Sequence, residues 1–115
     1  MSIEQPKHPE AEINKEYVEE KIRQAPARIE KEFTDPKRKG NPWLACANSQ
    51  LAGIQGFLEM IKPTKEFTAE QIKKARLYCR ELRDDILVLL PQYKDKETPR
   101  SVKDLVLAKI AGILG

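Results

Sequence analysis

Apolar residues recur at steps of three and four along most of the chain, and this spacing predicts α-helices with one inward side. The first series falls within residues 11–33 and consists of Tyr17, Val18, Ile22, Ala25, Ile29 and Phe33. Pro26 interrupts it, and a proline removes a backbone donor and clashes with the carbonyl four residues earlier. A break into two short helices is one outcome. Because the apolar register continues across Pro26, we expect a single kinked helix instead.

Two further series follow a 3-4-3-4-3 spacing, which is typical of the seam of a helical bundle. The second series consists of Leu44, Ala47, Leu51, Ile54, Leu58 and Ile61. The third series consists of Ile72, Ala75, Cys79, Leu82, Ile86 and Leu89. Gly53 and Gly56 lie inside the second helix, where a glycine costs about 1 kcal/mol relative to alanine. These two glycines indicate that a neighbouring backbone approaches the second helix closely.

Residues that favour helix ends flank the second and third series. Asn41 is expected to cap the second helix, with Pro42 at its first position, where a missing N–H costs nothing. Thr68 and Gln71 have the spacing of a capping box, which predicts the start of the third helix. Pro91 is expected to end that helix.

The C-terminal segment is apolar on most sides. Its helix is expected to start near Thr98-Pro99, or at Ser101 with a second capping box. Asp104 would complete that box. The apolar residues of this segment are Val102, Leu105, Val106, Leu107, Ile110, Ala111, Ile113 and Leu114.

This apolar surplus has two interpretations. A helix on the outside of a small bundle buries about one side, and residues 86–90 are also apolar all round. One chain can hardly cover both segments, so the surplus indicates self-association or a protein partner. The alternative is that the last helix threads the centre of the bundle and is covered by the other three.

Four helices with short connections predict an all-α fold, a four-helix up-down bundle with a kinked first helix. Residues 1–12 are polar and contain Pro6 and Pro9, so we expect a flexible N-terminal tail. Residues 13–115 are expected to form a single helical-bundle domain, a size that allows one hydrophobic core. The N-terminus lacks the apolar core of a secretory signal, and no segment approaches about 18 uninterrupted apolar residues. We therefore expect a cytoplasmic protein without membrane association.

The residue types needed for catalysis or metal binding are scarce. The chain has two cysteines and one histidine, His8, which excludes a zinc site rich in Cys and His. Cys46 and Cys79 lie on seam sides. If the second and third helices form a hairpin, Cys79 lies opposite Ala52, and an axial offset of roughly 9 Å separates the cysteines. That offset exceeds the reach of a disulfide, so we expect two small buried side chains; a redox pair or nucleophile is the alternative. We expect no enzymatic activity, cofactor or metal.

A row of basic residues is the sharper signal of a binding function. Lys73, Arg76, Arg80 and Arg83 form one positive ridge along the third helix. A second cluster, consisting of Lys37, Arg38 and Lys39, precedes Trp43. An exposed Trp beside basic residues can stack on a nucleic-acid base. The alternative is that nearby carboxylates neutralise the ridge and that Trp43 caps the core. The formal net charge of +3 barely shifts this balance.

The patterns therefore favour a non-enzymatic protein–protein interaction or adaptor module. It would form a homodimer or bind a protein partner through the apolar C-terminal helix. The interface residues expected on that helix are Val102, Leu105, Val106, Ile110, Ile113 and Leu114. The alternative is a small nucleic-acid-binding protein that uses the basic ridge and the second basic cluster.

Overall fold

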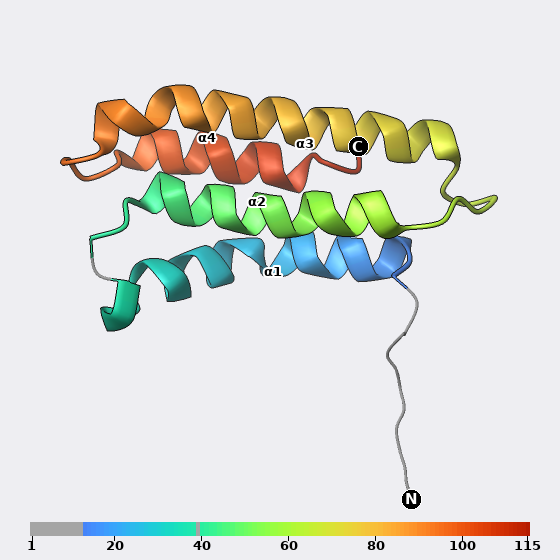
Figure 1. Ribbon diagram of the computed structural model, residues 1–115, viewed down its shortest axis with the longest axis horizontal. Helices are drawn as coiled ribbons and strands as arrows, with labels where there is room; N and C mark the ends of the chain where they lie inside the picture. Colours follow the sequence, from blue (N-terminus) through green and yellow to red (C-terminus); the bar gives the residue numbers. More distant parts are fainter. Residues whose placement is uncertain (1–12, 39) are drawn as a thin grey trace, which may run out of the picture.

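The computed structural model describes residues 13–38 and 40–115, and this part of the chain is helical, without a strand. Four α-helices pack against one another (Figure 1). They are α1 (Lys15–Phe33), α2 (Trp43–Met60), α3 (Ala69–Leu89) and α4 (Arg100–Ala111). Two short 3₁₀ segments, η1 (Pro36–Arg38) and η2 (Leu90–Tyr93), follow α1 and α3. The all-α prediction is confirmed. The expected tail of residues 1–12 lies outside the described residues.

Helix α2 is the central element of the packing. It packs closely against both α1 and α3, whereas α4 packs against α1. The hydroxyl of Tyr78 donates a hydrogen bond of 2.8 Å to the carbonyl of Lys109, which joins α3 to α4. Figure 1 shows the connections 34–42 and 90–99 at one end of the helices and the connection 61–68 at the other. No described helix combines the length and apolar character needed to cross a bilayer.

The starts of α1 and α2 differ slightly from the sequence-based expectation. Helix α1 begins at Lys15 rather than at Ala11, because the side chain of Asn14 accepts a hydrogen bond of 2.9 Å from the Tyr17 N–H and caps the first turn. It continues without interruption across Pro26, so a break into two helices does not occur. Helix α2 begins one residue later than expected, with Pro42 in the capping position.

The starts of α3 and α4 test the two predicted capping boxes. The box of Thr68 and Gln71 is present in full, with both reciprocal hydrogen bonds. The second box is wrong, because α4 begins at Arg100, with Pro99 as its N-cap and no side-chain cap bond. The Pro99 carbonyl already accepts from the N–H groups two and three residues after Arg100. Ser101 is therefore inside the helix, and Asp104 lies 3.4 Å from the Nε atom of Arg100 instead.

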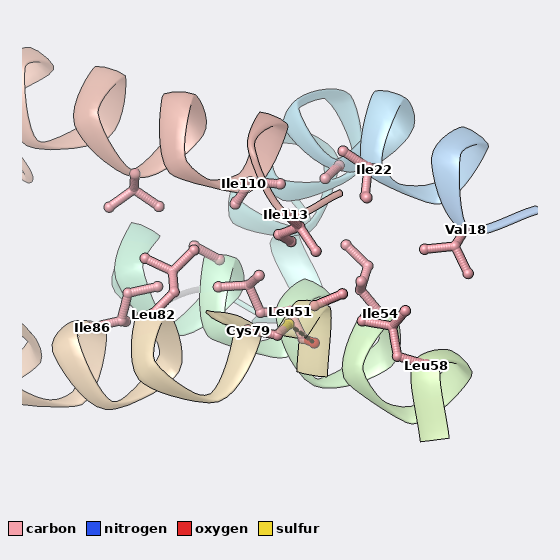
Figure 2. Close-up of a cluster of buried hydrophobic side chains, with 14 of the residues drawn as sticks. Val18, Ile22, Leu51, Ile54, Leu58, Cys79, Leu82, Ile86, Ile110 and Ile113 are labelled. Atoms are coloured by element: carbon pink, nitrogen blue, oxygen red, sulfur yellow. Dashed lines mark hydrogen bonds between the residues drawn. The ribbon is translucent and has the colours of Figure 1, made fainter. Parts of the chain in front are cut away.

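The hydrophobic core forms where the apolar series meet. Every residue of the second series is buried, and the third series is buried except for the partly covered Leu89. In Figure 2, labelled side chains from all four helices point toward one another, including Val18, Leu51, Leu82 and Ile110. The seam prediction is therefore confirmed.

The expectation attached to the two helical glycines is wrong within this chain. A Cβ atom added at Gly53 or Gly56 meets nothing within 4 Å, so no neighbouring backbone approaches them. Both lie on the side of α2 that α1 and α3 leave open. The close approach that the glycines permit is therefore unused in the described fold.

Candidate functional site: the outer surfaces of the bundle

Helix α4 places half of the expected interface residues inside the core. Val106, Ile110 and Ile113 are buried against the other helices. Val106 and Ile110 form the inward side of the 12-residue helix, and Ile113 lies in the turn just beyond its end. In this conformation they stabilise the chain's own fold and are inaccessible to a partner.

The other three expected interface residues lie further out. Val102 and Leu114 are partly buried against the core. Leu105 is 54% exposed and is the only fully surface-exposed member of the six. The excess of apolar surface on α4 is therefore smaller than the sequence indicates, because the other helices bury its inward side and partly cover Val102.

Helix α3 carries most of the exposed apolar surface. The segment 86–90 divides, since Ile86 is buried and Leu89 and Leu90 are partly buried. Its remaining two residues and the other exposed large apolar residues of α3 and α4 are spread around the outer sides of these helices, and we call them the outer apolar set. The set consists of Leu77, Tyr78, Leu87, Val88 and Leu105. The run of apolar residues at the end of α3 drew attention to Leu87 and Val88. Leu77 and Tyr78 lie among polar residues in the sequence, so no apolar run marked them.

The basic ridge of α3 divides into an anchored residue and three exposed ones. Arg83 donates from Nε to Asn48 Oδ1 at 3.1 Å and from Nη1 to Gln55 Oε1 at 2.7 Å, so it fastens α3 to α2. Lys73, Arg76 and Arg80 are exposed. None of these three cations has an ion-pair partner among the described residues. Neutralisation of the ridge by nearby carboxylates stays a prediction, and the four carboxylates concerned are exposed on the same helix, namely Glu70, Glu81, Asp84 and Asp85.

Trp43 is only 1% exposed, so of its two interpretations the surface ring that stacks on a base is wrong. Its indole Nε1 donates to Glu30 Oε2 at 2.7 Å, and the Nζ atom of Lys103 lies 5.7 Å from the ring centroid. The interpretation of Trp43 as an aromatic cap of the core is confirmed. A nucleic-acid-binding function thereby loses its only predicted stacking platform.

The second basic cluster lies at the end of the bundle near the start of α2. Residues 33–36 and 40–42 line a shallow hollow together with residues 94–96 of the other connection. The backbone N–H of Lys37 donates to Asp35 Oδ1 at 2.9 Å, and Lys37 itself is exposed. The side chain of Arg38, and Lys39 as a whole, lie outside the described residues. Lys94 and Lys96, which line this hollow, had no place in the sequence-based site.

The two cysteines are buried, and no disulfide joins them. The Sγ atom of Cys79 lies 3.7 Å from the carbonyl oxygen of Leu51, beside the position that the hairpin geometry predicts. Burial raises the pKa of the Cys79 thiol to about 11, although the Arg83 cation acts in the opposite direction. The thiol is therefore protonated at neutral pH and is a poor nucleophile. Within the described residues, no three His, Cys, Asp or Glu side chains gather as metal ligands.

The described residues define a small all-helical protein with an apolar group and a basic group on its outer surfaces. A scan against protein-family models, a search of curated proteins and a search of solved structures each returned no match.

Proposed function

We propose that this protein is a non-enzymatic interaction module that associates with a second copy of itself through the outer apolar set. The observation that supports the proposal is the exposure of large aliphatic side chains on α3 and α4, with Val88 70% exposed and Leu105 54% exposed. Removing such groups from water yields about 25 cal/mol for each Å² of apolar surface buried. Single exposed leucines are common, but several on two neighbouring helices favour association.

The charges around this set would fix the geometry of a dimer. Glu81, Asp85 and Lys109 are exposed beside the apolar residues on α3 and α4. In a two-fold dimer the same surface of both copies makes the contact, so an acidic residue on the rim of one copy can face a lysine on the rim of the other. Such pairs would set the register of the dimer. The proposal keeps the up-down bundle and the kinked α1 as its architecture, and it keeps the expected cytoplasmic location.

Sedimentation equilibrium tests this proposal. We expect the full chain to dimerise at micromolar concentration and the double variant Val88→Lys/Leu105→Lys to remain monomeric, since two buried lysines would oppose each other across the interface. Met60→Lys is the matched control, because Met60 is 65% exposed on α2, away from the outer apolar set. A chain that stays monomeric at every accessible concentration and binds no hydrophobic dye contradicts the proposal. So does an equal loss of dimer in the Met60→Lys control.

A further inference from the structure

The outward side of α2 is a surface that the proposed dimer does not use. Five positions of α2 that face away from its buried series carry small, uncharged residues, and the exposed Glu59 and Met60 follow them at the C-terminal end of the helix. The five small residues are Ala45, Ser49, Ala52, Gly53 and Gly56, which we call the α2 outer face. Each of these residues is half-buried or exposed. The open space beside the two glycines means that another chain can approach the α2 backbone there.

Basic residues of α1 border the α2 outer face on one side. The ring of Tyr17 packs edge-on against Phe57 of α2, with ring centroids 5.0 Å apart, and this contact fixes which side of α1 meets α2. The Nζ atom of Lys21 lies 5.2 Å from the Tyr17 centroid. Arg28 and Lys31 line a shallow hollow together with Gln50 of α2. These three cations form a row along this border, and the carboxylates of Glu32 and Asp35 line the same hollow beside Arg28 and Lys31.

Basic residues of α3 border the α2 outer face on the opposite side. The hydrogen bonds from Arg83 to Asn48 and Gln55 place this edge of α3 directly against α2. Arg80 and Arg76 precede Arg83 by one and two turns on the same edge. None of the exposed cations in the two rows pairs with a carboxylate within the described part of the chain. Their charges are thus available to a partner.

We propose that the α2 outer face docks an acidic α-helix of a partner protein. Helices pack with their axes 8–10 Å apart, and small residues at the contact permit the shorter end of that range. A helix seated over Gly53 would have Lys21 along one flank and Arg80 along the other. Glutamate or aspartate side chains on both flanks of the incoming helix would reach the two rows. The uncharged floor suits the small or apolar side chains that lie between those flanks.

The same observations disfavour two other occupants. A second copy of the chain would bring two identical sets of cations together, and that repulsion opposes a symmetric dimer through this face. A nucleic-acid strand would find no stacking platform, since Trp43 is buried and Tyr17 is packed against Phe57.

Fluorescence anisotropy with the full chain tests this docking proposal. The probe is a synthetic helical peptide as long as α2, with alanine and leucine along one side and glutamate along both flanks. A peptide with lysine in place of every glutamate is the control for charge, and short single-stranded and duplex DNA are the competing probes. We expect the acidic peptide to bind, the basic peptide not to bind, and neither DNA to displace the acidic peptide.

Two variants locate the binding on the α2 outer face. The double variant Arg76→Glu/Arg80→Glu reverses one row, and we expect it to weaken binding of the acidic peptide by roughly tenfold or more. Gly53→Leu fills open space at an exposed helical position, so the fold is kept while the close approach is blocked. It should weaken binding by a similar factor without changing any charge. Arg100→Glu/Lys109→Glu on α4 is the matched charge control and should bind normally.

The outcomes separate this proposal from the dimer. Acidic-peptide binding that is absent, or that neither variant weakens, overturns the docking proposal. Tighter binding of DNA, which the acidic peptide does not displace, also overturns it and assigns the basic rows to nucleic acid. Circular dichroism of each variant verifies its fold. The Val88→Lys/Leu105→Lys variant should bind the acidic peptide as the original chain does, so dimerisation and docking can fail independently.

Discussion

Helices α2 and α4 are both apolar around much of their circumference, yet the bundle treats them differently. Helix α2 lies between α1 and α3 and buries seven of its residues, including Trp43 and Leu51. Helix α4 buries only Val106 and Ile110 within its helical span. The outward residues along the middle of α2 are alanine, serine and glycine, with the large side chain of Met60 exposed only at the C-terminal end of the helix, whereas α4 turns the large side chain of Leu105 outward from its middle. A helix that is apolar on most sides can therefore be a central helix with two packed neighbours, or an outer helix that exposes large side chains to water.

The difference has an energetic consequence. A small residue on an outer surface exposes little apolar area, so α2 can face water with an uncharged side at little cost. An exposed leucine leaves roughly 1.5–3 kcal/mol of burial unrealised. Association would therefore bury the exposed large apolar side chains on α4 and at the end of α3. The α2 outer face exposes little apolar area and only offers room for a partner.

The largest expected effect tests the claim that α2 supplies the centre of the core. Leu51→Ala removes a fully buried side chain, and we expect it to lower the free energy of unfolding by about 3 kcal/mol. Leu105→Ala, the same substitution on α4, should lower it by less than about 1 kcal/mol. Urea denaturation followed by circular dichroism measures both. Equal losses for the two variants would break the comparison, because they would mean that Leu105 is as well packed as Leu51.

The sequence allowed the seams and the inward sides of α1, α2 and α3 to be predicted, because burial follows the three-and-four spacing directly. The Thr68 capping box was equally predictable, since it depends only on neighbours in sequence. The exposure of the α4 side chains could not be predicted from the sequence, because it depends on how far α1 and α3 extend over this helix. The position of Trp43 also depends on tertiary structure, since Glu30 and Lys103 come from other helices. The amide partners of Arg83 on α2 gave no signal for the same reason.

The next largest effect is the pH dependence of the free energy of unfolding, which reports on the contact of Cys79 in α3 with Leu51 in α2. The pKa of Cys79 is about 11 in the folded protein, against an ordinary value of 9.0 in the unfolded chain. Between these values the unfolded chain releases a proton that the folded protein keeps, so rising pH favours unfolding. The stabilisation is complete below pH 9 and falls by on the order of 2 kcal/mol as the pH approaches 11.

Denaturation of the original chain and of Cys79→Ala at a series of pH values measures this effect. Lysine and tyrosine side chains also titrate in this range, so the readout is the difference in slope between the two proteins. We expect Cys79→Ala to be less stable at neutral pH but to lose less stability on going to alkaline pH. Parallel slopes would show that the thiol is not shielded beside the Leu51 carbonyl.

A smaller effect compares the starts of α3 and α4. Thr68→Ala removes the cap acceptor of the Gln71 N–H, and we expect a loss of about 1 kcal/mol in the free energy of unfolding. Ser101→Ala should change it by less than about 0.5 kcal/mol, because Ser101 lies inside α4 and caps nothing. Thermal denaturation of the two variants checks the difference. If Ser101→Ala lowers the free energy of unfolding as much as Thr68→Ala does, Ser101 acts as a helix cap, contrary to the structure.

The smallest effect concerns the α2 outer face and has the opposite sign. Gly53→Ala adds a methyl group into open space at a helical position, so it should raise the free energy of unfolding by about 0.5–1 kcal/mol through helix propensity alone. The matched variant Gly112→Ala should not stabilise the fold, because a Cβ atom there lies 3.2 Å from the Tyr78 hydroxyl. A stabilised Gly53→Ala protein means that folding did not require this glycine. That result is the one expected if α2 has an open side at Gly53, whereas a destabilised variant would show that α2 has no open side there.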